Sequence, residues 1–289
     1  MNRFIYFFLF LLLSGLVRGQ LAEVQANYNS IGDVDFIAYN NTPAPLFLNI
    51  DFADLENTTF NEPLPFIKML QPGFNSLFTL QREPGAEVPR FNHQIKIFKS
   101  NPWSMADLDF PYLIPLAPGE EAMVLEVKSL SGFYGIDEPT SWNATGFSVK
   151  PGQEVFAART GTVVEVTGAK RSGDPQSWYQ SWPNSVTVLQ PDGTLICYRN
   201  VMDDSKKLKA GEKIFAGQSI GHITLSAAEL VVVIFQHTLN TSELRFIIPR
   251  FTIEEGTGVL IAARKYKVIH PKEIRGMEMT SREKRQNLK

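Results

Sequence analysis

Two stretches of the chain repeat one pattern, and this repeat constrains the fold more than any other feature. The first stretch covers residues 149–168 and reads VKPGQEVFAARTGTVVEVTG; the second covers 208–221 and reads LKAGEKIFAGQSIG. In each, a Pro-Gly or Ala-Gly turn precedes a short alternating run, and a second glycine then reverses the chain. Between them, two β-rich runs flank the turn at Pro191-Asp192-Gly193. The pattern predicts paired β-hairpins of a small barrel, with a third hairpin between them.

The ordered series of these motifs resembles a known family of enzymes. It reads G-x-x-V-x-A-A-R-x-G-x-V-x-x-V, then N-x-V-x-V-x-x-P-D-G-T-x-x-x-Y, then L-K-x-G-x-x-I-x-A-G-Q-x-I-G. This order resembles the catalytic domain of the lysostaphin/LytM-type zinc metallopeptidases, which cleave peptide cross-links in bacterial cell walls. The resemblance extends over roughly residues 113–270, and it implies a small β-barrel of the LytM type.

The family's zinc ligands have no counterpart in this sequence. Such enzymes hold zinc with the His and Asp of a His-x-x-x-Asp motif and with the second His of a later His-x-His. When this sequence is aligned with the family on the glycine turn, Trp142 stands at the His position and Gly146 at the Asp position of the first motif. An alternative register takes Asp137 as the Asp, which places Phe133 at the His position. Neither register supplies a histidine. Zinc needs three or four nitrogen, oxygen or sulfur ligands.

The later motifs depart from the family in the same way. The strand that carries a further His in the family reads Tyr198-Arg199-Asn200-Val201, with Asn200 at the His position. The His-x-His strand reads LVVVIF at 230–235, so that Leu230 and Val232 take the two His positions. The resemblance therefore implies a degenerate member with no catalytic residues and no bound metal. The four histidines, at positions 93, 222, 237 and 270, lie outside the matching positions, and a relocated zinc site is the alternative.

The chain begins with an apolar stretch that follows a lone basic residue, Arg3. The run FIYFFLFLLL and the small or apolar Val17 and Gly19 before Gln20 are typical of a secretory signal peptide at residues 1–19. The alternative is that this segment is kept as an amino-terminal anchor. We expect an exported protein, in the periplasm or cell envelope of a bacterium, with no spanning segment once the signal is cleaved.

Short runs of alternating apolar residues, separated by Asn, Pro and Gly, fill the next part of the chain. They lie at 35–39, 46–52, 76–80 and 94–99 and predict an all-β domain at 20–112, an immunoglobulin-like β-sandwich. A Pro- and aromatic-bearing connector at 101–119 marks the boundary to the barrel domain, placed at 113–275. The single cysteine, Cys197, excludes an internal disulfide and is expected to be a small buried hydrophobe.

Aromatic residues gather near the first barrel hairpins, at Trp142, Trp178, Tyr179 and Trp182. One interpretation is a surface for glycan or peptide, and the other is that these side chains anchor loops around a lost zinc site. The loop at 171–183 matches one that walls the substrate groove in the family. The candidate groove or recognition residues are Asp137, Trp178, Tyr179, Trp182, Tyr198 and Arg199.

The C-terminal part is expected to add one more hairpin, formed by 243–249 and 259–262 around the glycines at 256 and 258. The last residues, 276–289, form a charged segment without a long apolar face, and we expect a solvated tail. The net charge of −2 argues against nucleic acid as a partner.

Two functions remain open on the sequence alone. The first is an exported, catalytically inactive, peptidase-like protein without a cofactor, which binds peptidoglycan or an envelope protein and regulates wall hydrolysis. The second is an active zinc metallo-endopeptidase of peptidoglycan that uses other ligands.

Overall fold

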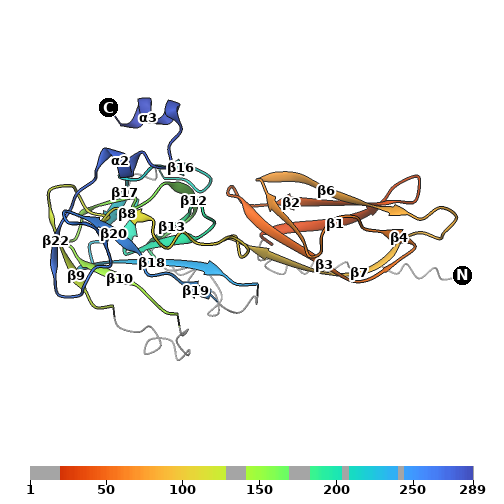
Figure 1. The fold of residues 1–289 in the computed structure, drawn as a ribbon, viewed down its shortest axis with the longest axis horizontal. Coiled ribbons are helices and arrows are strands. Elements are labelled where there is room, and N and C mark those ends of the chain that lie inside the picture. Colours follow the sequence, from red (N-terminus) through yellow and green to blue (C-terminus); the bar gives the residue numbers. More distant parts are fainter. Residues whose placement is uncertain (1–19, 128–140, 169–182, 204–207, 240–243, 289) are drawn as a thin grey trace, which may run out of the picture.

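The computed structural model describes residues 20–127, 141–168, 183–203, 208–239 and 244–288. Within these ranges the chain is almost entirely β, with two short helices (Figure 1), so the predicted all-β class is confirmed. The strands of the first unit are β1 (Ala22–Tyr28), β2 (Val34–Asn40), β3 (Leu46–Glu56), β4 (Thr58–Thr59), β5 (Phe66–Leu70), β6 (Gly73–Arg82) and β7 (Arg90–Phe98). No helix in the described ranges is long and apolar enough to cross a membrane.

The first unit consists of two sheets that enclose one apolar core. The sheets have the strand orders β1-β2-β6-β4 and β5-β3-β7. On β2 the alternate residues Val34, Phe36 and Ala38 are buried, because successive side chains of a strand point to opposite faces. The four runs that the sequence predicted lie in β2, β3, β6 and β7.

The second unit is built around a large antiparallel sheet. Its strands are β8 (Pro111–Tyr112), β9 (Glu121–Leu125), β10 (Thr145–Ser148), β11 (Glu154–Phe156), β12 (Gly161–Thr167), β13 (Ser185–Leu189), β14 (Leu195–Arg199), β15 (Val201–Met202), β16 (Lys213–Ile214), β17 (Ser219–Ile223), β18 (Glu229–His237), β19 (Leu244–Phe246), β20 (Arg250–Ile253), β21 (Gly256–Gly258) and β22 (Lys265–Lys267). The large sheet has the order β16-β12-β13-β14-β18-β10-β9-β22, with β19 paired to β18.

The two repeated stretches pair with each other, and the prediction that each forms its own hairpin is wrong. Strand β11 of the first stretch pairs with β17 of the second, and β12 of the first pairs with β16 of the second. The glycines do reverse the chain, and Gly217 has a φ of 79°, but each reversed strand finds its partner in the other stretch. The third predicted hairpin is present, because β13 pairs with β14 across the turn at Pro191-Asp192-Gly193.

The remaining hairpin is displaced from its predicted position. Strand β20 pairs with β21, so the turn lies at Glu254-Glu255 and residues 259–262 form no strand. Strand β8 pairs with β20, and Phe110 already belongs to the core of the second unit. The chain thus joins the second unit before the predicted boundary at residue 113.

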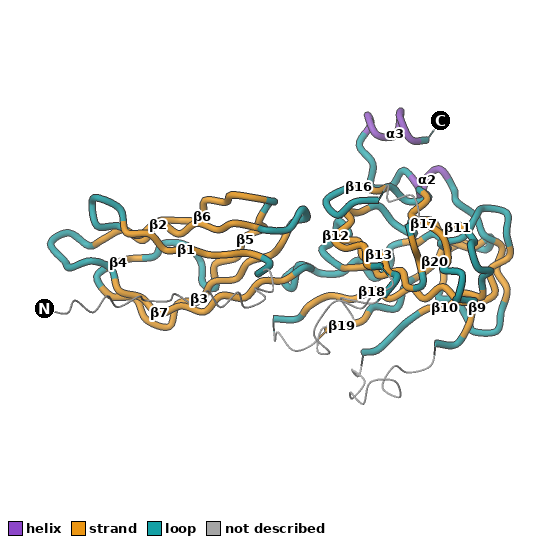
Figure 2. The backbone as a smooth tube through the Cα atoms, turned by 180° about the vertical axis from the view of Figure 1, so that it is seen from behind, coloured by secondary structure: helices purple, strands orange, loops and turns teal. Residues whose placement is uncertain are grey.

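The C-terminal segment packs on the second unit and is not simply solvated. It contains α2 (Lys272–Arg275) and α3 (Ser281–Asn287). Between the helices, Met279 is buried and Glu278 pairs with Arg159 at 2.8 Å. Helix α3 stands away from the body of the unit in both views (Figures 1 and 2).

An apolar cluster joins the two units. Phe47 and Phe98 of the first unit pack with side chains from one face of the large sheet, which come from β13, β14, β18 and β19. Beside them, the Ser100 hydroxyl lies 2.6 Å from His237 Nδ1 and accepts a hydrogen bond from the His237 backbone N–H. Strand β18 is therefore covered on both faces, which explains why LVVVIF is a continuous apolar run rather than an alternating one.

Candidate functional site

Three neighbouring strands bring most of the positions that match the family's site together. Strand β18 lies between β10 and β14, and Val232 is the register partner of both Thr145 and Tyr198. Gly146 is paired with Val231, one residue away. Gly146 and its partner Val231 lie toward the other face of the sheet from Val232, because Val231 belongs to the cluster that contacts the first unit and Val232 to the main cluster of the second unit. The matched positions are thus neighbours in the large sheet but do not share one face.

The two matched positions on β18 lie in a closed apolar core, whereas Trp142 and Gly146 lie on the other face of the sheet. Leu230 and Val232 are 0% and 1% exposed and belong, with Phe147 and Ile196, to the main cluster of the second unit. On the other face of the sheet, a Cβ on Gly146 would lie 2.9 Å from Val127 Cγ2, so a side chain at this position would displace its neighbours. Trp142 is half-buried, and its ring packs edge-on against Phe246 with centroids 4.8 Å apart.

The polar groups nearest to this core are already engaged. The Tyr198 hydroxyl accepts a hydrogen bond from the Ala158 backbone N–H at 2.8 Å, and burial raises the pKa of Tyr198 above its usual value. Asn200 has a φ of 65°, and its Nδ2 donates to the Glu229 carbonyl at 2.9 Å. Arg199 is half-buried at the end of β14.

Zinc does not fit the residues at these positions. Leucine, valine and glycine offer no side-chain lone pair, and the Tyr198 oxygen is buried in a hydrogen bond. Within the described ranges, no three His, Cys, Asp or Glu side chains are grouped so as to hold a metal. Four of the predicted groove residues, Asp137, Trp178, Tyr179 and Trp182, lie outside the described residues, as does Phe133.

A hollow of about 550 Å³ lies beside Asn200, the position of a family histidine. Its polar lining comes from Asn184, Thr224, Ser226 and Glu229, together with Asn200 itself, and Leu125 and two alanines supply apolar surface. Amides and hydroxyls of this kind can hydrogen-bond a peptide or a sugar. The sequence reasoning named Asn200 but none of its neighbours here, which come from three other segments.

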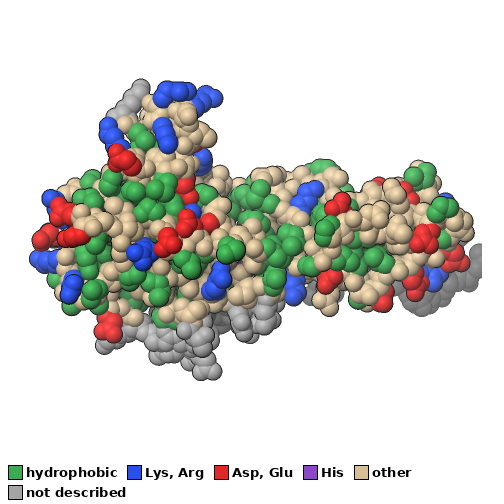
Figure 3. Space-filling view, in the orientation of Figure 1, with side chains coloured by type: hydrophobic (Ala, Val, Ile, Leu, Met, Phe, Trp, Pro, Cys, Tyr) green, Lys and Arg blue, Asp and Glu red, His purple; other side chains and the backbone are tan. Residues whose placement is uncertain are grey.

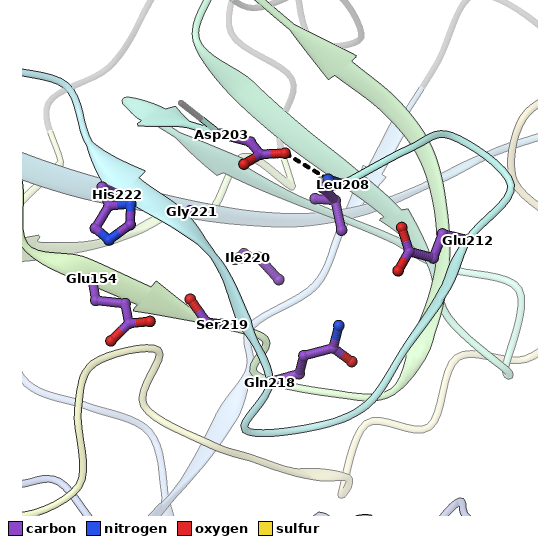
Figure 4. Close-up of a pocket in the computed structure, with 9 residues that line it drawn as sticks. All are labelled: Glu154, Asp203, Leu208, Glu212, Gln218, Ser219, Ile220, Gly221 and His222. Carbon is purple, nitrogen blue, oxygen red and sulfur yellow. Dashed lines mark hydrogen bonds between the residues drawn. The ribbon is translucent and has the colours of Figure 1, made fainter. Parts of the chain in front are cut away.

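A second hollow, of about 450 Å³, lies around β17 (Figure 4). Glu154 and His222, which are register partners on β11 and β17, lie on one side of it. Glu212 and Gln218 lie on the other side, and the Asp203 carboxylate accepts a hydrogen bond from the Leu208 backbone N–H at 2.5 Å.

The four histidines have separate surroundings. His222 is exposed on this second hollow, and His93 packs among aromatic rings of the first unit. His237 is buried at the junction of the units, where burial lowers its pKa to about 4. A ring nitrogen of His270 lies 2.9 Å from the Ile114 carbonyl.

A buried ionic cluster around Arg159 was not predicted. Arg159, 2% exposed, donates to Asp192 at 2.7 Å, to Glu278 at 2.8 and 3.0 Å, and to the Tyr112 hydroxyl at 3.2 Å. Its guanidinium also lies 3.7 Å from the centroid of the Phe110 ring. The only sign in the sequence was an arginine inside the apolar run of the first stretch.

The pKa values in this cluster follow from burial and from the arginine. Burial alone would lower the pKa of Arg159, but its bonds to Glu278 and the nearby acids raise it above the ordinary value. Burial opposes ionisation of Asp192, yet Arg159 holds the pKa of that carboxyl below its usual range. Burial raises the pKa of Glu278 although Arg159 acts in the opposite direction, and burial raises the pKa of Tyr112 to about 12.

Solved structures similar to this chain come from bacterial peptidases. The catalytic domain of the antimicrobial peptidase lysostaphin from Staphylococcus simulans is 21% identical, with a TM-score of 0.27 over 36% of this chain and 73% of that one. Further solved structures match at similarly low TM-scores. They include the deep-sea M23 metalloprotease pseudoalterin (13% identity, TM-score 0.34, 56% of this chain and 97% of that one) and Helicobacter pylori Csd3 (13%, 0.32, 88% and 57%).

The lysostaphin domain is of the type that the ordered hairpin series resembles, and its TM-score with this chain is below 0.5. No family model matches the sequence, and no curated protein matches it. At such low identities the similarity assigns neither an activity nor a ligand to this chain.

Proposed function

We propose that this chain is an exported, peptidase-like protein that does not catalyse hydrolysis and that binds cell-wall peptidoglycan or an envelope protein. In this proposal the first unit is an immunoglobulin-like sandwich, the second is a degenerate barrel of the LytM type, and residues 1–19 are a signal peptide. Regulation of wall hydrolysis is the role that we propose for the complex.

The observation that carries the proposal is the burial of Leu230 and Val232 in a closed apolar core. These residues occupy the positions of the family's His-x-His. A catalytic zinc site needs three protein ligands and an open position for water. A position that is fully packed with aliphatic side chains offers neither a ligand nor access for water.

The hollow beside Asn200 is the place where we propose that the partner binds. Its lining combines amide, hydroxyl and carboxylate groups with short apolar side chains. Such a surface can pair with the backbone and side-chain amides of a peptide, and binding there needs no metal.

The enzymatic part of the proposal is tested by metal content and hydrolysis. We expect no stoichiometric zinc by elemental analysis, no change in melting temperature with a chelator, and no release of peptides from purified peptidoglycan. A real site would be visible, because zinc at a thousandfold above its Kd stabilises the fold by about 4 kcal/mol. One zinc per chain together with chelator-sensitive hydrolysis would show that the chain is instead a zinc endopeptidase with other ligands.

The binding part is tested by co-sedimentation with insoluble peptidoglycan. Asn200→Gly removes the carboxamide and tolerates the φ of 65°, so the fold should persist while binding weakens. Lys150→Gln, at an exposed position outside the lining of this hollow, is the matched control. Equal binding by both variants would remove the hollow from the proposal.

A further inference from the structure

The C-terminal segment sorts its charges by sign. Residues 277–288 contain two acidic side chains, Glu278 and Glu283, and three basic ones, Arg282, Lys284 and Arg285. Both acids are paired with cations of the body, Glu278 with Arg159 at 2.8 Å and Glu283 with Lys213 at 2.6 Å. The three bases are exposed and form no ion pair within the described residues.

Helical geometry explains this sorting. Successive residues on an α-helix are rotated by about 100° around its axis. The side of α3 opposite to Glu283 therefore carries Arg285, with Arg282 and Lys284 at its two edges. Because the Lys213 pair turns Glu283 toward the body, Arg285 points outward and Arg282 and Lys284 lie on either side of it. A sequence that seems nearly balanced in charge thus presents a cationic outer face.

Helix α3 is held firmly enough to present this face. The Thr280 side chain accepts from the Glu283 backbone N–H while the Glu283 carboxylate accepts from the Thr280 N–H, which makes a capping box. Met279, which precedes the N-cap, is buried, and Arg275 donates to the Asn287 carbonyl at 3.3 Å. The helix projects from the second unit, and Lys and Arg side chains gather over it (Figure 3).

We propose that this outer face of α3 docks on the anionic surface of a lipid bilayer. A protruding element with cations on its outer half meets a flat surface before the rest of the molecule does. A flexible polyanion would instead be held best in a groove lined by bases, and neither of the two hollows has a Lys or Arg among its lining residues. This surface is separate from the hollow beside Asn200 and does not depend on the function proposed for it.

The expected affinity gain is electrostatic. Each Lys or Arg near an anionic bilayer strengthens binding roughly fivefold, so three should give roughly a hundredfold preference for anionic over neutral vesicles. Attraction of this kind is screened by salt within about 10 Å at 0.1 M. Binding should therefore disappear at high ionic strength.

The test is sedimentation of the full chain with vesicles of phosphatidylglycerol and phosphatidylcholine, compared with phosphatidylcholine alone. The variant Arg282→Gln/Lys284→Gln/Arg285→Gln should lose the preference for the anionic vesicles. The control Arg82→Gln/Lys150→Gln/Arg264→Gln removes the same charge from exposed positions elsewhere and should retain the preference. Both variants share the apolar N-terminal segment, so its contribution cancels, and unfolding curves confirm that both are folded.

Three results would overturn the proposal. The first is an unmodified protein that binds anionic and neutral vesicles equally. The second is an equal loss in both variants, which would show that net charge alone governs binding. The third is α3-dependent binding to soluble polyphosphate without any binding to vesicles, which would make a polymer the partner.

Discussion

Two parts of the second unit's core are filled in opposite ways. Around β18, Leu230, Val232 and Ile234 pack with other aliphatic and aromatic side chains. At Arg159, the same unit encloses a guanidinium that donates hydrogen bonds to two carboxylates and a phenol. The aliphatic region holds the two positions matched to the family's His-x-His, whereas the ionic region joins Arg159 and Asp192, which the sequence marked only as members of the hairpin motifs.

The difference shows that buried charge in this chain serves to join segments. Arg159 connects Tyr112 of the connector, Asp192 of the β13–β14 turn and Glu278 of the C-terminal segment. The connector is held further by Ser104, whose hydroxyl donates to the Asp192 carbonyl at 2.5 Å. Burying ions is costly unless each is paired, and here the pairs tie three distant parts of the chain together.

The largest effect on stability is expected when Arg159 is replaced. Arg159→Met keeps an apolar stem of similar length but leaves Asp192 and Glu278 buried without their cation, and we expect a loss of about 3–5 kcal/mol in the free energy of unfolding. Chemical denaturation measures it. Arg159→Lys is the control, because it keeps the charge and loses the planar fork, and it should be less damaging. A Met variant as stable as the parent would mean that the cluster contributes nothing.

The aliphatic region should respond to one added hydroxyl. Val232→Thr conserves shape but places a polar group where the structure has no partner for it, with a cost of about 1–3 kcal/mol. Thr145→Val, at its half-buried register partner, is the control that changes the same atoms in the opposite sense. If Val232→Thr leaves the free energy of unfolding unchanged, water enters this part of the core, and a metal site there would no longer be opposed by the packing.

The sequence located elements better than it located their partners. Alternation placed β2 and β3 correctly, and Pro191-Asp192-Gly193 identified a real hairpin, because both signals are local. The pairing of β11 with β17 and of β12 with β16 could not be deduced in this way, since a glycine reverses the chain without specifying which strand lies alongside.

The same limit applies to the candidate site. The sequence match assigned Tyr198 and Val232 to separate motifs without predicting that they are register partners. It could not show that Tyr198 is bonded to Ala158 or that Arg159 has partners at positions 112, 192 and 278. These contacts join residues that are about 30 to 120 positions apart, and no spacing in the sequence marks them.

The smallest effect is expected at the exposed counterpart of the buried cluster, the pair between Glu283 and Lys213. Hydrogen bonds from Lys213 and from Thr280 lower the pKa of Glu283 from 4.5 to about 2. The contribution of this group to stability is therefore fully present above about pH 4.5 and is lost as the pH falls toward about 2, since the unfolded chain takes up the proton first. Because the carboxylate is exposed, global unfolding should change little, and the effect should appear as fraying of α3.

Amide exchange of residues 283–287 followed from pH 5 to pH 2 measures this fraying. Glu283→Gln should abolish the pH dependence while leaving the Arg159 cluster intact. An unchanged pH profile in that variant would place the titrating group elsewhere, with Glu278 as the next group to examine.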